Sequence, residues 1–347
     1  AALDVLDGHI ANALAGNVGG SQTPTDPETP DTPTVPNPPE TGNIDPETGW
    51  DLDKVNKVTS EDNVVVPVPK GYTASTVDGE KSVATGFVIK EGTDGSLTSG
   101  VNEFVWVPVS EISDLYDETN NAGQLWDFGT SSSPKNPAIK RAYPTTQNSG
   151  YREPDVVTKV WNSETSAYDK DGADLIPDNL NQAGFLTTET ANDLNKDGSV
   201  TADDFKIQLQ NEFDEMIKSV EKYGGFYIGR YETGNLSGEI AVVQKGNTDI
   251  SSQTWYTQYK VSKTIKANDN VVSSMIWGSQ WDATLRWMQT SEVEKVKNFA
   301  TSSVAYGNFS VNSIEYVENE ETKTTTVGTG TQIPTGSAEI TKINNIY

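Results

Sequence analysis

Oxygen-bearing side chains are regularly spaced in the stretch DLNKDGSVTADDF, residues 193–205. A twelve-residue calcium loop of the EF-hand type places its ligands at positions 1, 3, 5, 7, 9 and 12, with a glycine at position 6 where the backbone turns sharply. Counted from the first aspartate, the ligands are Asp193, Asn195, Asp197, Ser199, Thr201 and Asp204, and Gly198 falls at the turn. The spacing therefore predicts a calcium site, in which Ser199 uses its carbonyl and Thr201 binds directly or through water. The alternative is a solvated acidic turn before a helix.

The last position of this loop holds an aspartate where EF-hands most often have glutamate, and Val200 supplies the apolar anchor at position 8. The loop thereby resembles that of dockerin modules, which carry two such loops and bind cohesin partners with them. Upstream, AYDKDGADLIPD (residues 167–178) has acids at some ligand positions, but Ala167 stands at position 1 and Pro177 interrupts the helix that should follow. We therefore predict a structural calcium site and no cohesin-binding role. Whether residues 167–178 bind a second calcium is left open.

The composition of the chain excludes several kinds of chemistry. Its 347 residues include 25 Lys+Arg and 50 Asp+Glu, a net charge of −25, which repels nucleic acids and anionic membrane surfaces. The chain has no cysteine and one histidine, His9, so cysteine nucleophiles, histidine triads and Cys/His metal sites are not expected. No run of about 18 apolar residues occurs, and we expect nothing in this chain to span a bilayer.

Pairs of acids could carry out glycoside hydrolysis, which needs two carboxylates on either side of one bond. Glu153 with Asp155 is one such pair, and Glu212 with Asp214 and Glu215 is another set. With 50 acids in the chain, close pairs are expected by chance. The second set also falls on a predicted helix, where a solvated face is the ordinary interpretation. We therefore predict that the protein is not an enzyme.

The helix after the calcium loop is the strongest predicted element. Within residues 202–223, apolar side chains recur at intervals of three and four, as on one face of a helix. They are Phe205, Leu209, Phe213, Met216, Ile217 and Val220. Asp203 and Asp204 fall in the first turn, where carboxylates favour the helix dipole, and Gly224 ends the pattern. Calcium in the loop would fix the start of a core helix.

Three parts of the chain are expected. Residues 1–16 predict a short amphipathic helix, or else a disordered leader, because apolar side chains follow near a helical period; these are Leu3, Leu6, Ile10 and Leu14. Residues 17–49 are rich in Pro, Thr and acids, and predict an extended linker. Residues 50–347 are expected to form an α+β domain with the calcium-loop insert near 165–222. Its predicted strands include NVVVPVP, VATGFVIKEG and NEFVWVPV.

Two segments carry a resemblance to a known family. The strand GGFYIGRYETG (residues 224–234) and the tryptophan-rich SSMIWGSQWDATLRWM (residues 273–288) together resemble the formylglycine-generating-enzyme, or sulfatase-modifying-factor, family. NEFVWVPV fits the opening strand of that family. The resemblance covers about residues 60–347. It implies a C-type-lectin-like fold with much irregular structure and bound calcium.

The second of these segments predicts a strand followed by a helix. Ser279, with Asp282 three residues later, is expected to cap the helix. Trp281, Leu285 and Met288 are expected to share one face of it.

Catalysis does not transfer with the resemblance. Catalytic members of the family oxidise a substrate cysteine with a pair of cysteines and copper, and related iron enzymes use several histidines. This chain has no cysteine, and His9 lies far outside the domain, so the resemblance implies no catalytic residue here. The family's G-N-V-x-E-W motif and R-G-G-S strand do not follow KINNIY (residues 342–347). We therefore expect the C-terminal part of the family's domain to be missing from this chain.

The resulting prediction is a non-enzymatic, extracellular or cell-surface binding protein of the adhesin kind. It would display a calcium-stabilised C-type-lectin-like domain on a stalk, and present aromatic loop residues to a protein or glycan ligand. Those candidate contacts, for which core or loop packing is the competing interpretation, are Tyr143, Tyr151, Trp161, Trp255, Tyr256 and Tyr259. One alternative is a pilin-like or pseudopilin subunit that assembles through residues 1–16. The other is a degenerate enzyme of the formylglycine-generating superfamily.

Overall fold

The computed structural model of the chain describes residues 2–5, 42–111, 115–117, 129–130, 133–134, 141–142, 159–162, 167–171, 186, 193–236, 240–249, 255–291, 313–318, 320–326, 333–338 and 342–347. Its helices are α3 (Ala202–Tyr223), α4 (Trp255–Ser262) and α5 (Gly278–Ser291). The strands of the main sheet are β1 (Ala2–Val5), β4 (Tyr72–Ala74), β5 (Val88–Glu91), β6 (Glu103–Pro108), β13 (Gly225–Gly229) and β17 (Val271–Ser274).

The remaining strands pair in small groups. They are β2 (Val55–Thr59) with β3 (Val65–Pro69), β7 (Tyr116–Asp117) with β10 (Arg141–Ala142), β8 (Gly129–Thr130) with β9 (Ser133–Pro134), β11 (Lys159–Asn162) with β12 (Ala167–Asp171), β14 (Gly234–Leu236) with β15 (Ile240–Val242) and β16 (Thr248–Asp249), and β18 (Ser313–Glu318) with β19 (Glu321–Thr326). Among the described residues, no helix is both long and apolar enough to cross a membrane.

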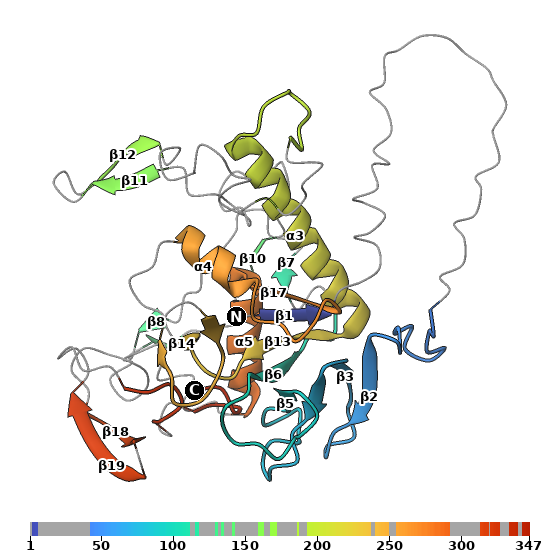
Figure 1. The fold of residues 1–347 in the computed structure, drawn as a ribbon, viewed down its shortest axis with the longest axis vertical. Coiled ribbons are helices and arrows are strands. Elements are labelled where there is room, and N and C mark those ends of the chain that lie inside the picture. The colour runs from blue at the N-terminus through green and yellow to red at the C-terminus, as the bar shows by residue number, and fades with distance from the viewer. Residues whose placement is uncertain are drawn as a thin grey trace.

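The main sheet has six strands in the order β17-β1-β13-β6-β5-β4, and each neighbouring pair is antiparallel. Strands β6 and β13 lie side by side, with Val107 opposite Phe226, although residues 109–224 separate them in the chain. Figure 1 shows α3, the long helix of that intervening segment, running from the sheet toward the periphery. The combination of helices with antiparallel strands confirms the predicted α+β class.

Both faces of the main sheet are buried. Side chains along a strand point alternately to opposite faces. On β13, Phe226 and Ile228 belong to one apolar cluster and Tyr227 to the other. All five residues of this strand are buried. The segment GFYIG therefore reads as a continuous run of buried residues and lacks the polar alternation of a half-exposed strand.

Helices α3 and α5 cover one face of the sheet. Phe213 and Val220 of α3, together with Trp287 of α5, pack against Val105 and Val107 of β6. Burying side chains of this size stabilises the fold by about 1.5–3 kcal/mol each. Since α3 supplies several of them, whatever fixes the start of α3 also acts on the core.

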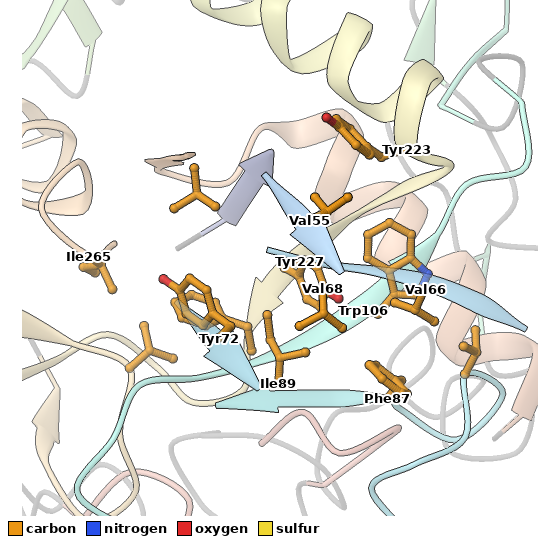
Figure 2. Close-up of a cluster of buried hydrophobic side chains, with 14 of the residues drawn as sticks. Val55, Val66, Val68, Tyr72, Phe87, Ile89, Trp106, Tyr223, Tyr227 and Ile265 are labelled. Atoms are coloured by element: carbon orange, nitrogen blue, oxygen red, sulfur yellow. The ribbon is translucent and has the colours of Figure 1, made fainter. Parts of the chain in front are cut away.

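The hairpin of β2 and β3 covers the opposite face. Figure 2 shows Val55, Val66 and Val68 from this hairpin gathered with Trp106 and Tyr227 of the sheet. The Trp106 and Tyr227 rings have centroids 4.9 Å apart. The Tyr227 hydroxyl donates a hydrogen bond to the Pro67 carbonyl at 3.1 Å, so the one polar group of this side chain is satisfied inside the core.

Helix α3 confirms the helix predicted over residues 202–223, and all six of its predicted apolar positions are buried. It ends at Gly224, where φ is +77° and the backbone N–H donates to the Val220 carbonyl at 2.8 Å. The strands predicted in NVVVPVP, VATGFVIKEG and NEFVWVPV are also present, as β3, β5 and β6.

The face predicted for the tryptophan-rich helix is confirmed in part: Leu285 and Met288 pack into the apolar cluster on the sheet, but Trp281 does not. Helix α5 begins at Gly278, one residue before the predicted cap, and the Gln280 side chain accepts the Trp277 N–H at 3.1 Å. Trp281 is 43% exposed. The buried residues of α5 are Ser279, Gln280, Asp282, Ala283, Thr284, Trp287 and Met288. Because four of these are polar, the apolar pattern alone did not locate the buried side of the helix in full.

The predicted N-terminal helix is wrong at its start. Residues 2–5 form β1, with Leu3 opposite Tyr227 of β13 and Asp4 opposite Val272 of β17. A strand held on both sides satisfies its backbone groups through tertiary pairing, which overrides a short helical periodicity. The rest of the predicted helix and most of the predicted linker, residues 6–41, lie outside the described residues.

The domain begins before Trp50. Ile44 forms a β-bridge with Asp51, and Asp45 is buried against Lys57. Trp50 donates its indole N–H to the Lys222 carbonyl at 3.0 Å, which ties this segment to the end of α3. Residues 42–49, predicted as the last part of the linker, are therefore part of the folded domain.

The last described segment closes against the sheet by a tight turn. Ile343 and Ile346 exchange backbone hydrogen bonds around Asn344 and Asn345, which have φ of +49° and +62°. A Cβ at Gly86 would lie 2.0 Å from the Asn344 carbonyl oxygen, so this close approach requires glycine.

Candidate functional site

The predicted calcium loop is a turn held by its own acidic side chains. The Asp193 carboxylate accepts the N–H groups of Asp197 at 3.0 Å and Gly198 at 2.7 Å. The side chains of Asn195 and Asp197 each accept the N–H two residues ahead, at 3.0 and 2.8 Å. Gly198 has φ of +90°, the left-handed conformation that the turn requires. The same side chains that predicted a metal site therefore also hold the loop in its turn through hydrogen bonds to its backbone.

Asp204 fastens the loop to the helix. Its side chain is 0% exposed. One carboxylate oxygen accepts the N–H groups of Leu194 and Asn195, at 2.6 and 3.0 Å. The other oxygen accepts the N–H and the hydroxyl of Thr201, at 2.7 and 3.3 Å. The bond to the Thr201 N–H is that of a capping box. A carboxylate has about four acceptor positions, and all are used here. The predicted role of Asp204 as a calcium ligand therefore competes with its role as a helix cap.

The environment of Asp204 favours its charged form. Burial by itself would raise the pKa of Asp204, but the backbone N–H groups of Asn195, Thr201 and Leu194 stabilise the carboxylate and lower the pKa below its ordinary value. The group therefore remains ionised in mild acid and keeps all its donors.

The loop is anchored by two apolar side chains. Leu194 and Val200 pack against a cluster that contains Phe205 and Leu209 of α3 and Tyr259 of α4. The Phe205 and Tyr259 rings meet edge to face, with centroids 5.4 Å apart. Val200 thus takes the anchoring position predicted for it.

Calcium prefers oxygen ligands from carboxylates, amides and carbonyls, and the loop carries that set. Within the part of the chain that the structure describes, however, no three acidic or histidine side chains gather closely enough to hold a metal ion. Asp193, Asn195 and Asp197, the Ser199 carbonyl and Thr201 are the groups that would hold calcium, because Asp204 is committed to backbone donors.

The upstream stretch does not form a matching loop where it is described. Residues 167–171 are the strand β12, with Lys170 opposite Val160 of β11. An extended strand cannot wrap its side chains around one ion as a tight loop does. Residues 172–178 lie outside the described residues.

One predicted ligand contact is wrong. Tyr259 is 3% exposed, and its hydroxyl donates to Glu212 at 2.7 Å and accepts from Gln208 at 2.8 Å, so it joins α4 to α3 as a core residue. Trp255 and Tyr256 begin α4, and Trp161 lies in β11, but their side chains are outside the description. Tyr143 and Tyr151 lie outside the described residues altogether.

The acid set on α3 is structural in part. Glu212 accepts hydrogen bonds from Gln208 and Tyr259 and pairs with Lys263. Glu215 lies 2.7 Å from Lys218 on the same helix. Glu153 and Asp155, the other predicted pair, lie outside the described residues.

A buried charge network, formed by Glu80, Lys90, Glu103 and Arg230, was missed by sequence reasoning. One guanidinium nitrogen of Arg230 lies 2.7 Å from Glu80 and 2.7 Å from Glu103, and the Lys90 ammonium lies 3.2 Å from Glu80. Lys90 and Glu103 are 0% exposed. Two carboxylates thus face two cations, so the group is neutral when every member is ionised.

The two carboxyls of this network have opposite pKa shifts. Burial would raise the pKa of Glu80, but the Ser75 hydroxyl, Arg230 and Lys90 outweigh burial and lower it. For Glu103, burial is the stronger effect and the pKa is raised, although Arg230 and Lys90 oppose the rise. Within the described structure, one Glu103 oxygen and the Arg230 Nε have no hydrogen-bond partner. Glu103 is therefore the more weakly stabilised anion.

The sequence carried one signal of this network. Lys90 and Glu103 interrupt otherwise apolar strands, in FVIKE and NEFVWV. A charge inside an apolar strand indicates a buried partner, but nothing in the spacing names Glu80 or Arg230 as that partner. Because all four of its members are buried and pair with one another, the network supports the sheet.

A scan against models of protein families found no match for this chain, and searches of curated proteins and of solved structures found no similar protein. The resemblance to the formylglycine-generating-enzyme family thus stays a prediction from the quoted sequence segments.

Proposed function

We propose that this protein is a non-enzymatic binding protein of the adhesin kind, which acts outside the cell or at its surface. The domain of residues 42–347 would be a C-type-lectin-like scaffold that presents its long inserted segments to a protein or glycan. Residues 17–41 are not proposed as a stalk, because residues 2–5 and 42–49 both belong to the folded domain and the segment between them joins two parts of it. Their Pro/Thr/acid composition favours an extended connection.

The observation that carries this proposal is the position of the long insertion. Strands β6 and β13 are direct neighbours in the centre of the sheet, yet the chain leaves the sheet after β6 and returns only at Gly225. The sheet itself is covered by two apolar clusters, and its buried Lys90 and Glu103 pair with Glu80 and Arg230. A rigid core that supports a long excursion is the arrangement expected of a display scaffold.

We infer that calcium stabilises the base of this insertion. The ion would be held by Asp193, Asn195, Asp197, the Ser199 carbonyl and Thr201, directly before α3. With free calcium at a hundred times its dissociation constant, binding would stabilise the fold by about 2.7 kcal/mol. The loop is anchored to α3 through Val200 and Phe205, so ordering the loop would also order the start of a core helix.

Thermal melts in calcium and in chelator test this part of the proposal. The wild-type chain should melt at a higher temperature in millimolar calcium than in EGTA. The double variant Asp193→Asn with Asp197→Asn should lose that difference, because it keeps side-chain acceptors for the loop N–H groups but removes two charges. The matched control is Asp78→Asn, at a fully exposed acid remote from the loop in sequence, which should keep the difference. Equal melting with and without calcium in the wild type would refute a structural calcium site.

Ligand binding is tested on printed glycans and surface glycoproteins. Because the chain has no cysteine, a single Asp78→Cys substitution allows specific fluorescent labelling at an exposed position. We expect the labelled chain to bind a subset of the array, and the double variant Trp255→Ala with Tyr256→Ala to lose that binding. Trp281→Ala, on the exposed face of α5, is the control that should bind normally. A folded chain that binds nothing on such arrays would contradict the proposal.

A further inference from the structure

The first strand of the chain occupies an internal position in the main sheet. Strand β1 pairs antiparallel with β13 on one side and with β17 on the other. Opposite β17, all four of its residues have partners, from Ala2 against Ser274 to Val5 against Val271. Figure 1 shows β1 lying between these strands, near the base of α3. If β1 left, two strands would expose unpaired backbone groups in the interior of the sheet, which is a site for another strand.

Strand β1 is joined to the rest of the domain through residues 6–41, which separate it from the next described residue, Gly42. The composition of residues 21–41 predicts an extended spacer. For a linker of this length, the effective concentration of β1 at its own site is on the order of millimolar. A second copy at a similar local concentration can therefore compete.

We propose that β1 is an exchangeable strand: residues 2–5 of one copy occupy the position between β13 and β17 of a second copy. The site recognises this strand mainly through backbone hydrogen bonds, and each copy carries an identical strand, so exchange costs no pairing. Copies that stand close together on a surface would thereby be joined through their spacers. The net charge of −25 opposes the approach of two copies, and exchange should therefore increase with ionic strength.

The lack of cysteine gives a direct test with the full chain. Asp4 and Val272 are paired residues of β1 and β17, and paired Cα atoms in an antiparallel sheet lie about 4.5–5.5 Å apart, within the range of a disulfide. One variant carries Asp4→Cys and a mass tag, and the other carries Val272→Cys. The two are mixed in mild denaturant, refolded together at about 1 mM and oxidised. Non-reducing electrophoresis then resolves the tagged heterodimer from the two homodimers.

We expect the yield of heterodimer to be at least severalfold higher than in a control mixture in which Asp78→Cys replaces Val272→Cys. The heterodimer should decline on tenfold dilution and increase with salt. The double variant Asp4→Cys with Val272→Cys, refolded dilute, should instead close its disulfide within one chain. Ala2→Cys with Ser274→Cys repeats the whole test at a second register pair, because disulfide geometry differs between positions.

Two results would overturn the proposal. In the first, the double variants form the disulfide within single chains, but the mixtures at about 1 mM give no more heterodimer than the control at either register pair. This result would show that β1 stays in its own domain. The second is failure of both double variants to close, which would show that β1 does not pair with β17.

Discussion

Among the described residues, the loop of residues 193–204 and the buried charge network organise their charges in opposite ways. In the loop of residues 193–204, every acidic partner comes from within one short segment, and the acceptors bind backbone N–H groups of that segment. In the buried network, Glu80, Lys90, Glu103 and Arg230 come from separate segments and bind one another. The first arrangement folds a local turn, and the second depends on the whole sheet.

The difference determines how each place fails. Loss of a side chain from residues 195–199 of the loop leaves polar groups that water can reach, because these residues are exposed. A network residue that is lost leaves a charge without a partner in a dry interior, which is far more costly than the lost attraction alone. The network should therefore control the stability of the sheet, and the loop should adjust the stability of α3.

The largest effect is expected for Arg230→Met. This change leaves Glu80 and Glu103 without their shared partner, and we expect it to lower the free energy of unfolding by about 3–5 kcal/mol. Urea unfolding followed by tryptophan fluorescence measures the loss. Adding Glu103→Gln to this variant should restore part of it, because one uncompensated charge is removed. A loss below about 1 kcal/mol for Arg230→Met would place the network with ordinary surface pairs.

Asp204→Ala should have the next largest effect, about 2 kcal/mol, because it removes a helix cap and leaves three partly buried N–H groups without their acceptor. The same unfolding measurement is made in EGTA, so that calcium does not contribute. Asp197→Ala is the matched change in the exposed part of the loop, where only the contact with the Ser199 N–H and the Asn195 amide is lost. If Asp197→Ala cost more than Asp204→Ala without calcium, the cap would not be the main structural contact of the loop.

The pH dependence of stability should differ between the calcium loop and the buried network, and we expect this difference to be smaller than the effects of the two preceding substitutions. The lowered pKa of Asp204 means that its contribution is present above the ordinary carboxyl pKa of about 4 and is lost as the pH falls further. The raised pKa of Glu103 acts in the opposite direction, since ionisation disfavours the folded state as the pH rises above about 4.

Urea midpoints between pH 3 and 7 check this for two neutral variants. Asp204→Asn should weaken the acid-induced loss of stability. Glu103→Gln should gain relative to wild type as the pH rises. The same pH trend in both variants would contradict the opposite shifts.

The smallest effect on stability is expected for an exposed ion pair that belongs neither to the calcium loop nor to the buried network. Lys266 lies 2.7 Å from Asp269 on the surface. Exposed pairs contribute little because water screens them and the side chains lose freedom. Lys266→Met should therefore leave the urea midpoint within experimental error. A loss comparable with that of Arg230→Met would mean that burial does not set the strength of these pairs.

Several elements were predictable because their signal is local. The period of apolar residues in 202–223 specified both the helix and its buried face. The spacing from Asp193 to Asp204 specified a closed turn before that helix, with Val200 as its anchor. Local spacing did not reveal that Asp204 would be used by four donors, because those donors meet only after the loop has folded.

Other predictions failed where a distant partner decided the outcome. Leu3 has a helical neighbour pattern in the sequence, yet its backbone pairs with Tyr227 of β13. Tyr259 was a candidate for ligand contact, but Glu212 and Gln208 on another helix bury its hydroxyl. Trp281 was expected on the same face of α5 as Leu285 and Met288, but it is exposed, and α5 packs polar Gln280 and Thr284 inward.

The sequence by itself determined the α+β class of the chain, its acidic character, the absence of cysteine chemistry, strands β3, β5, β6 and β13, and the loop with its helix. These properties follow from composition and from contacts within a few residues. Only the tertiary structure decided that β1 lies inside the sheet, that β6 meets β13 across the long insertion, and that Glu80, Lys90, Glu103 and Arg230 share one interior. The physical reason is the same in each case: backbone pairing and charge pairing act between atoms that are close in space, and the spacing of residues along the chain does not encode which distant segments come together.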